Sequence, residues 1–348
     1  MTIMKIPENK IKSIAKLMTE AMSASPNSYY RAQQPLGEQG DFITSPEISQ
    51  MFGEMIGIWA LHAFEKLGKP SKFNLVELGP GRGLLMRDLL KGTSKQTSFH
   101  QALQIHLLDI NPILIAEQKK QLADYAVNWI DKIEDLPPLP TIFIANEFFD
   151  ALPIRQYIKK STQWHEVHVM IKEHNAAEII YLDISEEKQK QLNDQHPNAQ
   201  EDGVAEESPE SLHVMQSIAK HIKTHQGAAL IIDYGYDIEL SHRTKNQYNS
   251  TLQAIKDHKF HPVFEDLGQA DLSAHVDFNA LKNVALKQGL KVTGAISQRI
   301  LLQTLGIDLR LESLLAANQE LKEILKKQHH RLTAKDTMGE LFKAIIIE

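Results

Sequence analysis

The chain has 348 residues, with 44 acidic and 38 basic side chains and a formal net charge of −6. This charge, without a dense run of lysine or arginine, argues against a nucleic-acid partner. The absence of cysteine excludes disulfides, thiolate metal sites and a cysteine nucleophile. No histidine spacing typical of a metal site occurs, and no apolar run approaches the roughly 18 residues of a membrane span. We therefore expect an intracellular enzyme without a metal or stable membrane insertion.

The N-terminal 70 residues predict a helical extension followed by a surface loop. Apolar residues recur with helical spacing from Ile11 to Met22, so we expect an amphipathic helix that packs on the catalytic domain. The next segment is rich in Pro, Gly, Ser and Gln, which is typical of a loop. A helix start is expected at Ser45, with its hydroxyl as the cap, Pro46 at the first helical position and Glu47 as an early carboxylate. A buried helix should run from there to about Leu67. The first residues lack the features of a signal peptide or a convincing transit peptide.

The segment 73–83, FNLVELGPGRG, predicts a buried strand that turns directly into a helix. Its three glycines, at every second position, allow close approach of a ligand to the backbone. A dinucleotide loop needs a glycine where Leu84 stands, which disfavours a nicotinamide-dependent oxidoreductase. The spacing instead favours S-adenosylmethionine (SAM), with Glu77 near its ammonium group; a plain glycine-rich turn is the alternative. The loop residues expected at the cofactor are Glu77, Gly79, Pro80, Gly81 and Gly83.

Two further strands end in acidic residues that point to a nucleoside. The segment 104–109 predicts a strand whose terminal Asp109, followed by Ile110, is placed to accept the ribose hydroxyls. Asp109 could also serve as a cap for the next helix, and the two roles can coexist. Residues 127–130 predict a short third strand, with Asp131 near an adenine-facing loop.

A fourth strand is expected over 141–145, and its tip carries Asn146 and Glu147. Because parallel sheets bind ligands beyond the carboxyl ends of their strands, these residues should face the same crevice as the glycine loop. Phe148 and Phe149 follow and are expected to be exposed unless something packs on them. In the alternative interpretation both rings fold back into the core and Asn146 caps a turn.

The second half of the chain predicts an insertion and then a return to α/β structure. Residues 155–183 alternate as antiparallel strands do, and the acidic segment 185–207 suggests a solvated insertion or flexible flap. Further elements are expected at 208–224 (helix), 228–233 (strand), 277–288 (helix), 291–296 (strand), about 299–316 and 318–331 (helices) and 342–347 (strand).

Together these elements predict one large α/β domain with a mostly parallel sheet and an antiparallel final pair of strands. We divide the chain into a helical extension with an active-site loop (1–70), the first half of a Rossmann-like domain (71–154), an inserted β or flap element (155–207) and the second half with helical additions (208–348).

Four separated segments resemble one family closely: GDFITSPEISQMFGEMIGIW (40–59), VELGPGRGLLMRDLL (76–90), ANEFFDALPIRQ (145–156) and LIIDYGY (230–236), supported by ADLSAHVDF (270–278) and LLQTLGIDLR (301–310). They are similar to the MidA-like SAM-dependent methyltransferases, whose mitochondrial members methylate an arginine of a respiratory complex I subunit during assembly. The resemblance implies a class I methyltransferase fold, a SAM site that also includes Phe42 and Pro46, and a protein substrate. It implies a cytoplasmic location in a bacterium or the mitochondrial matrix in a eukaryote.

The sequence departs from the family pattern at three places. Asp109 stands where the family often has Glu, the segment before Thr251 lacks an expected glycine, and the acidic segment 185–207 aligns poorly. The cofactor residues are intact. The acceptor, the number of methyl groups added and the oligomeric state, a homodimer included, stay open.

Methylation of a guanidinium predicts carboxylates at the site, because a carboxylate orients this group through paired hydrogen bonds. Glu147 and Glu47 are the first candidates, with Asp150 and Asp277 behind them and His275 as a possible proton acceptor. The alternative function is an assembly or interaction factor that binds SAM with little turnover.

Overall fold

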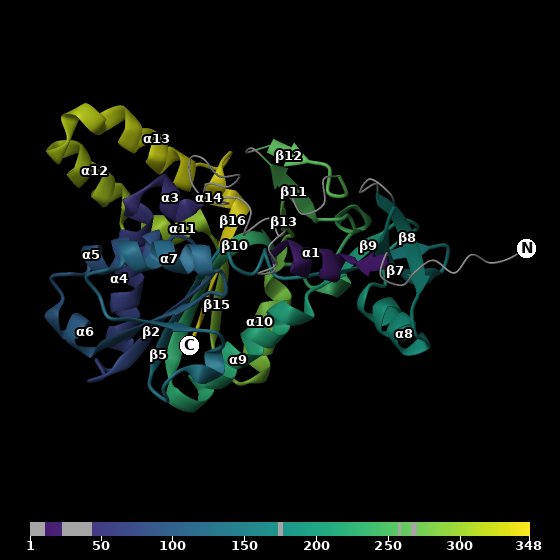
Figure 1. The fold of residues 1–348 in the computed structure, drawn as a ribbon, viewed down its shortest axis with the longest axis horizontal. Helices are drawn as coiled ribbons and strands as arrows, with labels where there is room; N and C mark the ends of the chain where they lie inside the picture. The colour runs from purple at the N-terminus through teal and green to yellow at the C-terminus, as the bar shows by residue number, and fades with distance from the viewer. Residues whose placement is uncertain (1–10, 23–43, 173–176, 257–258, 266–269) are drawn as a thin grey trace, which may run out of the picture.

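The computed structural model describes residues 11–22, 44–172, 177–256, 259–265 and 270–348. Within these ranges the strands form sheets of eight, five and three strands. Figure 1 shows the large sheet with its covering helices on one side of the molecule and the two smaller sheets on the other.

The large sheet has the order β15-β16-β10-β5-β2-β3-β4, with the short β14 (Val276–Asp277) beside β10. The pairs from β4 to β10 are parallel, whereas β16 runs antiparallel to both β10 and β15. The predicted mostly parallel sheet with an antiparallel final pair is confirmed. Its strands are β2 (Phe73–Leu78), β3 (Leu103–Leu108), β4 (Val127–Ile130), β5 (Thr141–Asn146), β10 (Gly227–Tyr236), β15 (Val292–Ser297) and β16 (Phe342–Ile347).

Helices cover both faces of this sheet, which explains why the central strands read as continuous apolar runs. Every residue of β2 and β5 is buried. One face packs on α4 (Gln50–Lys66) and α5 (Leu84–Gly92), and the other on α9 (Pro209–His225) and α10 (Phe278–Lys287). Two further helices beside this sheet are α6 (Thr97–Ala102) and α7 (Pro112–Gln121). Short 3-10 turns occur along the chain at Ile133–Asp135, Leu240–His242, Lys245–Gln247 and Gln319–Leu321.

The helix expected from Ser45 to Leu67 is interrupted. A short α3 (Ser45–Ile48) ends at Ser49, whose backbone is extended, and α4 begins at the next residue. The cap of α3 is Thr44, paired with Glu47 in a capping box, so the prediction of Ser45 as the cap was wrong by one residue. The interruption follows from Ser49, whose hydroxyl accepts the Met51 N–H and caps the second helix instead.

The N-terminal segment differs from the single helix expected on the catalytic domain. Its first residues form β1 (Ile11–Ser13), which pairs with β7 of the inserted sheet, and only then does α1 (Ile14–Met22) begin. The buried face of α1 packs with Ile154 and Val169 in the core of the inserted element. The boundary predicted at residue 155 therefore leaves out one strand of this sheet.

The inserted antiparallel sheet is confirmed, but the flexible flap is not. Residues 185–207 contain α8 (Glu186–Gln195) and a strand that pairs with β6. The segment is ordered because Leu192 is fully buried beside Trp164 and Tyr248. The acidic composition of the segment gives no sign of this apolar contact. The strands are β6 (Arg155–Lys160), β7 (Gln163–Ile171), β8 (Ala177–Asp183) and β9 (Val204–Glu207).

Two additions in the last third of the chain were only partly foreseen. A three-stranded sheet of β11 (Gln253–Lys256), β12 (Lys259–His261) and β13 (Asp271–Ser273) was not predicted. The helix expected over 299–316 is divided at Gly306, whose φ of 95° ends one helix and begins the next. The C-terminal helices are α11 (Gln298–Thr304), α12 (Ile307–Ala317), α13 (Lys322–Thr333) and α14 (Met338–Leu341).

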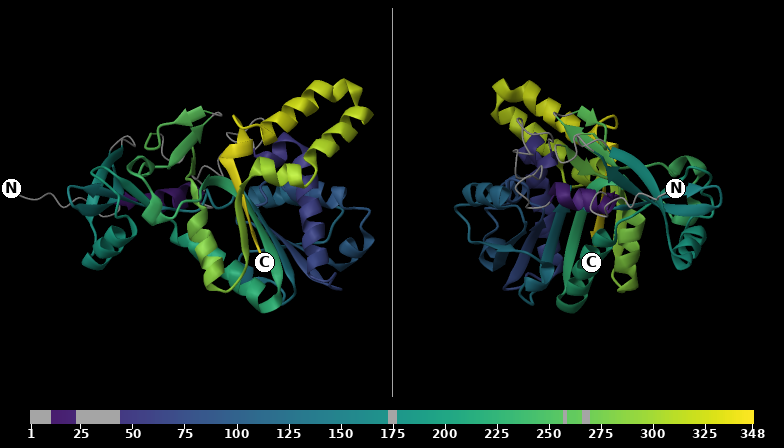
Figure 2. Two further views of the ribbon diagram at one scale, coloured as in Figure 1. Left: turned by 180° about the vertical axis from the view of Figure 1, so that it is seen from behind. Right: turned by 45° about the vertical axis from the view of Figure 1, so that its right-hand side comes forward.

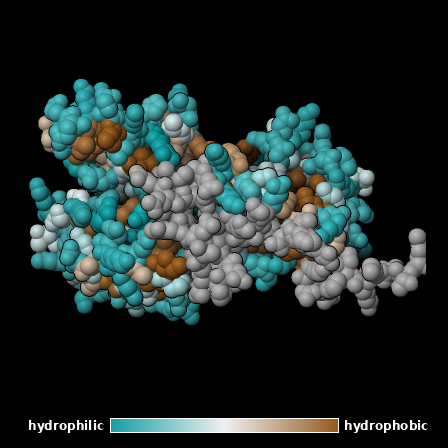
Figure 3. All heavy atoms as spheres, turned by 45° about the horizontal axis from the view of Figure 1, so that its top comes forward, coloured by the Kyte–Doolittle hydropathy of each residue, from teal (hydrophilic) through white to brown (hydrophobic). Residues whose placement is uncertain are grey.

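Helices α12 and α13 form an arm that projects from the body in all three ribbon views (Figure 2). Leu309 and Ile324 are exposed on this arm, and apolar residues are visible there in Figure 3. Among the described residues, no helix is both long and apolar enough to cross a membrane.

Candidate active site

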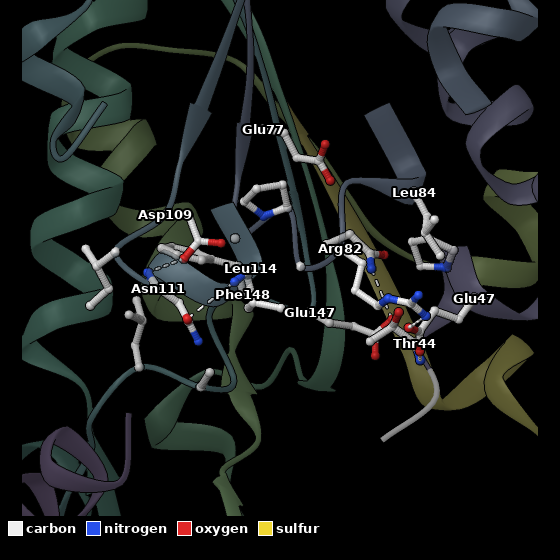
Figure 4. Close-up of a pocket in the computed structure, with 18 residues that line it drawn as sticks. Thr44, Glu47, Glu77, Arg82, Leu84, Asp109, Asn111, Leu114, Glu147 and Phe148 are labelled. Carbon is white, nitrogen blue, oxygen red and sulfur yellow. Dashed lines mark hydrogen bonds and ion pairs between the residues drawn. The ribbon is translucent and has the colours of Figure 1, made fainter. Parts of the chain in front are cut away.

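A pocket of about 180 Å³ lies at the carboxyl ends of β2, β3 and β5. In Figure 4 Asp109 and Asn111 lie on one side of it and Thr44, Glu47 and Arg82 on the other. Ten residues predicted for the site line it: Pro46, Glu47, Glu77, Gly79, Pro80, Gly81, Asp109, Ile110, Asn146 and Glu147. Thr44, Arg82, Leu84, Asn111, Leu114, Phe148, Ala151 and Leu152 complete the lining.

The glycine loop joins β2 directly to α5, as its sequence predicted. Gly79 and Gly81 have φ of 62° and 52°, a region that residues with a side chain adopt at a cost. A Cβ on Gly79 would lie 2.8 Å from Cδ2 of Phe148, so a larger residue would also displace the pocket wall. Gly83, with φ of 82°, does not line the pocket but begins α5 and contacts Gln118.

Glu77 brings a buried carboxyl to the floor of the pocket. It is 3% exposed, and its Oε2 has no hydrogen-bond partner in the described part of the chain. Burial raises the pKa of Glu77 to about 8, although a backbone hydrogen bond from Met86 acts in the opposite direction. A buried, half-satisfied carboxyl next to bare backbone is the environment that a ligand cation would complete.

Asp109 is fixed from two directions. Its Oδ1 accepts the Asn111 N–H at 2.8 Å, and its Oδ2 accepts the Gln118 amide at 2.7 Å. Asn111, rather than Asp109, caps α7, because its side chain accepts the N–H groups of Ile113 and Leu114. Burial raises the pKa of Asp109. The capping alternative therefore applies to Asn111, which leaves Asp109 facing the pocket.

Glu147 is held in an unusual conformation at the opposite end of the pocket. Its φ is 51°, in the left-handed region that non-glycine residues rarely adopt. Its Oε1 accepts the Ser45 N–H at 2.8 Å and the Asn146 amide at 3.0 Å. Its Oε2 is buried without a partner in the described part of the protein. Burial, with a smaller contribution from Asp150, raises the pKa of Glu147 to about 7.

A second carboxylate, Glu47, reaches the same end of the pocket from α3. Its Oε2 accepts the Thr44 N–H at 3.3 Å, and its Oε1 lies 3.7 Å from a guanidinium nitrogen of Arg82. Arg82 also forms a closer ion pair, 2.9 Å, with Glu117. The pocket thus has acidic groups at both ends, and among the described residues that line it the one lysine or arginine is Arg82, which is itself paired.

Comparison with known proteins identifies the family. Residues 55–296 match the sequence model of the family described as "Putative S-adenosyl-L-methionine-dependent methyltransferase". The chain belongs to this family. It is 36% identical to a protein of Danio rerio and 32% identical to one of Homo sapiens, both named "Protein arginine methyltransferase NDUFAF7, mitochondrial". The alignments cover 95% and 96% of this chain and 82% and 80% of those proteins.

A solved structure from Burkholderia thailandensis, bound to S-adenosyl-homocysteine (SAH), has the same fold. Its TM-score is 0.85 at 24% identity, and the match covers 98% of this chain and 88% of that one. The class I methyltransferase fold and SAM as cofactor, both expected from the sequence, are therefore confirmed.

The pocket of this methyltransferase fits the parts of SAM. Glu77 with its unpartnered oxygen suits an ammonium group, the backbone at Gly79 and Gly81 allows close approach, and Asp109 can accept ribose hydroxyls. Ile110 and Leu114 also line the pocket and are apolar, as the surroundings of a base would have to be. None of the described residues forms a group of three or more His, Cys, Asp or Glu able to hold a metal ion.

Several predicted residues of the methyltransferase lie away from the pocket or outside the described residues. Phe42 falls in the undescribed segment 23–43. Asp131 is exposed and does not line the pocket. His275 and Asp277 line a different cavity, between the inserted element and the N-terminal ends of α9 and α10. His275 therefore has no position from which to accept a proton at this pocket.

Asp150 lies beneath the pocket rather than in its wall. Its backbone N–H and that of Phe149 donate to Oδ2 of Asp233, which turns the loop back into the protein. Burial raises the pKa of Asp150 to about 6 and that of Asp233 well above its ordinary value. The same turn buries Phe149 and leaves only Phe148 at the pocket, so the expectation of two exposed rings was wrong.

The sequence interpretation missed Arg82, Asn111 and Gln118. Arg82 lies inside the glycine motif, and its charge beside three glycines was an available signal. Asn111 before Pro112 is a recognisable helix start. Gln118 has no local signal, because it acts through contacts with three separate elements.

Proposed function

We propose that this methyltransferase transfers the methyl group of SAM to an arginine side chain of a protein. The names of the curated relatives support this acceptor. The observation that carries the proposal is that Glu147 and Glu47 are held at one end of the pocket by neighbouring N–H groups, those of Ser45 and Thr44, and that one buried Glu147 oxygen lacks a partner among the described residues. A guanidinium presents parallel N–H donors that match such carboxylates.

When bound, SAM supplies a methyl group on a positively charged sulfur. The protein's own contribution is alignment of the acceptor nitrogen and removal of one proton from it as the new N–C bond replaces the S–C bond. Glu147 Oε2 is the group we assign to orient the guanidinium and take this proton, and its pKa near 7 suits a general base. The Ser45 N–H and Asn146 amide fix the other oxygen and hence the direction of the carboxylate.

Glu47 and Asp150 have supporting roles in this proposal. Glu47 is 8% exposed at its side chain and is oriented by the Thr44 N–H, so it can hold the second edge of the guanidinium. Asp150 contributes repulsion that keeps the pKa of Glu147 raised. Neither His275 nor Asp277 has a role, because neither lines this pocket.

The partner is accordingly a protein, and a subunit of respiratory complex I is the acceptor that the family resemblance suggests. The relatives' names say that those proteins are mitochondrial. By the family resemblance the location would be the mitochondrial matrix in a eukaryote and the cytoplasm in a bacterium.

The test is methyl transfer from isotopically labelled SAM to proteins of cells that lack this enzyme, followed by hydrolysis and separation of the amino acids. We expect the label in methylarginine, and none with a Gly81→Val variant. Label in another amino acid would overturn the arginine proposal. SAH binding without transfer to any protein would instead favour the alternative, a SAM-binding assembly factor.

A further inference from the structure

Gln118, in the middle of α7, connects three elements around the nucleoside end of the pocket. Its side chain is fully buried. The amide nitrogen donates to the Gly81 carbonyl at 2.8 Å and to Asp109 Oδ2 at 2.7 Å. The amide oxygen accepts the indole N–H of Trp129 on β4 at 2.8 Å. One side chain therefore satisfies all three partners without lining the pocket itself.

The orientation of this amide is determined by its partners. The indole nitrogen of Trp129 can only donate, whereas the Gly81 carbonyl and the Asp109 carboxylate can only accept while the latter is ionised. The amide oxygen must therefore face Trp129, and its nitrogen must face the loop and the carboxylate. A flipped amide would lose all three bonds.

These bonds restrict the two groups that approach the cofactor. Gly81 has φ of 52°, and a glycine adopts other backbone conformations readily unless its carbonyl is held by a hydrogen bond. One Asp109 oxygen accepts the Gln118 amide and the other accepts the Asn111 N–H, and these two bonds fix the plane of the carboxylate. Each oxygen keeps a lone pair that can accept a hydrogen bond from a ligand. Gln118 is placed to fix both.

We infer that Gln118 is a positioning residue that presets Asp109 and the Gly81 peptide for a ribonucleoside, and so determines affinity for the cofactor's ribose. The inference rests on the SAM site and is independent of the acceptor. A purely structural role is the competing explanation, because Gln118 lies so close to Gly83, where α5 begins, that a Cβ on this glycine would be 3.4 Å from it.

The test measures SAH binding by titration calorimetry in Gln118→Leu, which keeps the size of the side chain but removes its hydrogen bonds. We expect the Kd for SAH to rise about tenfold, the effect of losing one or two buried hydrogen bonds. For the 2′-deoxyadenosyl analogue of SAH the substitution should raise the Kd only about threefold, because this ligand lacks one of the hydroxyls that Asp109 is preset to accept. Equal losses for the two ligands, or an unchanged Kd for SAH, would overturn the inference.

Gln121→Leu is the matched control, since Gln121 is on the same helix but accepts a hydrogen bond from Arg87. We expect it to leave both Kd values within twofold of wild type. If Gln118→Leu does not fold, Trp129→Phe keeps an aromatic ring but removes the donor to the amide oxygen, together with part of the ring volume, and should raise the Kd for SAH about threefold. An unchanged Kd in that variant would count against the inference.

Discussion

The backbone N–H of Ser45 donates a 2.8 Å hydrogen bond to the carboxylate of Glu147, a residue 102 positions later in the chain. This bond ties the short helix α3 to the loop after β5, and it can form because Ser45 is the first residue of α3, whose N–H has no acceptor within the helix. One Glu147 oxygen is thereby held while the other stays without a partner in the described part of the chain. The proposed acceptor site depends on this arrangement.

Gly79→Ala should weaken SAH binding by about tenfold or more. The new Cβ would meet Phe148 at 2.8 Å, in addition to the roughly 1–2 kcal/mol that a positive φ costs a residue with a side chain. Gly68→Ala is the control, because Gly68 has φ of 80° but no atom within 4 Å of an added Cβ. Calorimetry measures the change in SAH affinity, and thermal unfolding measures the loss of stability caused by the positive φ. Equal changes in SAH affinity for both variants would refute a contact specific to the pocket.

Binding of SAH at pH 7 should release a proton from Glu77. Burial places the pKa of Glu77 at about 8, so the carboxyl is mostly neutral in the free protein at pH 7. A ligand ammonium beside it lowers the pKa and expels the proton, so affinity should rise with pH up to about 8. Calorimetry in two buffers of different ionisation enthalpy counts the protons. Glu77→Gln should release close to one proton fewer, and an equal count in both proteins would contradict this assignment.

The free protein should lose stability as the pH rises from about 4.5 to about 7, and Glu147 should contribute to this loss. The pKa of Glu147 is near 7 when folded and near 4.5 when unfolded, so the folded state keeps a proton that the unfolded state releases. Glu147→Gln removes this contribution. Its Tm, relative to wild type, should increase between pH 4.5 and pH 7.5. Parallel Tm curves for the two proteins would show that Glu147 does not titrate as proposed.

The position of the site could be predicted because parallel strands end at one edge of the sheet. Glu77 lies one residue before the end of β2, Asp109 and Glu147 directly follow β3 and β5, and the register of these strands brings all three to one pocket. The glycine spacing likewise predicted that bare backbone lies at the site, and Gly79 and Gly81 line the pocket.

The course of the loop after β5 could not be predicted in the same way. Asp150 lies only three residues beyond Glu147, yet its N–H bonds to Asp233 from a strand that comes much later, and this turns it beneath the pocket. His275 was chosen because histidine often acts as a proton acceptor. It follows the last strand of the three-stranded sheet, which was not predicted, and lines a different cavity. Gln118 shows the same limit, because tertiary hydrogen bonds leave no pattern in the local sequence.

The most direct test of the proposed acceptor site compares methyl transfer with SAH binding in Glu147→Gln. The control is Glu340→Gln, whose carboxylate is 41% exposed and pairs with Arg299 away from the pocket. We predict that Glu147→Gln binds SAH within about twofold of wild type and transfers labelled methyl groups to the protein acceptor at least ~100-fold more slowly, the usual loss on removing a general base. Full transfer by Glu147→Gln with unchanged SAH binding would contradict the role assigned to Glu147.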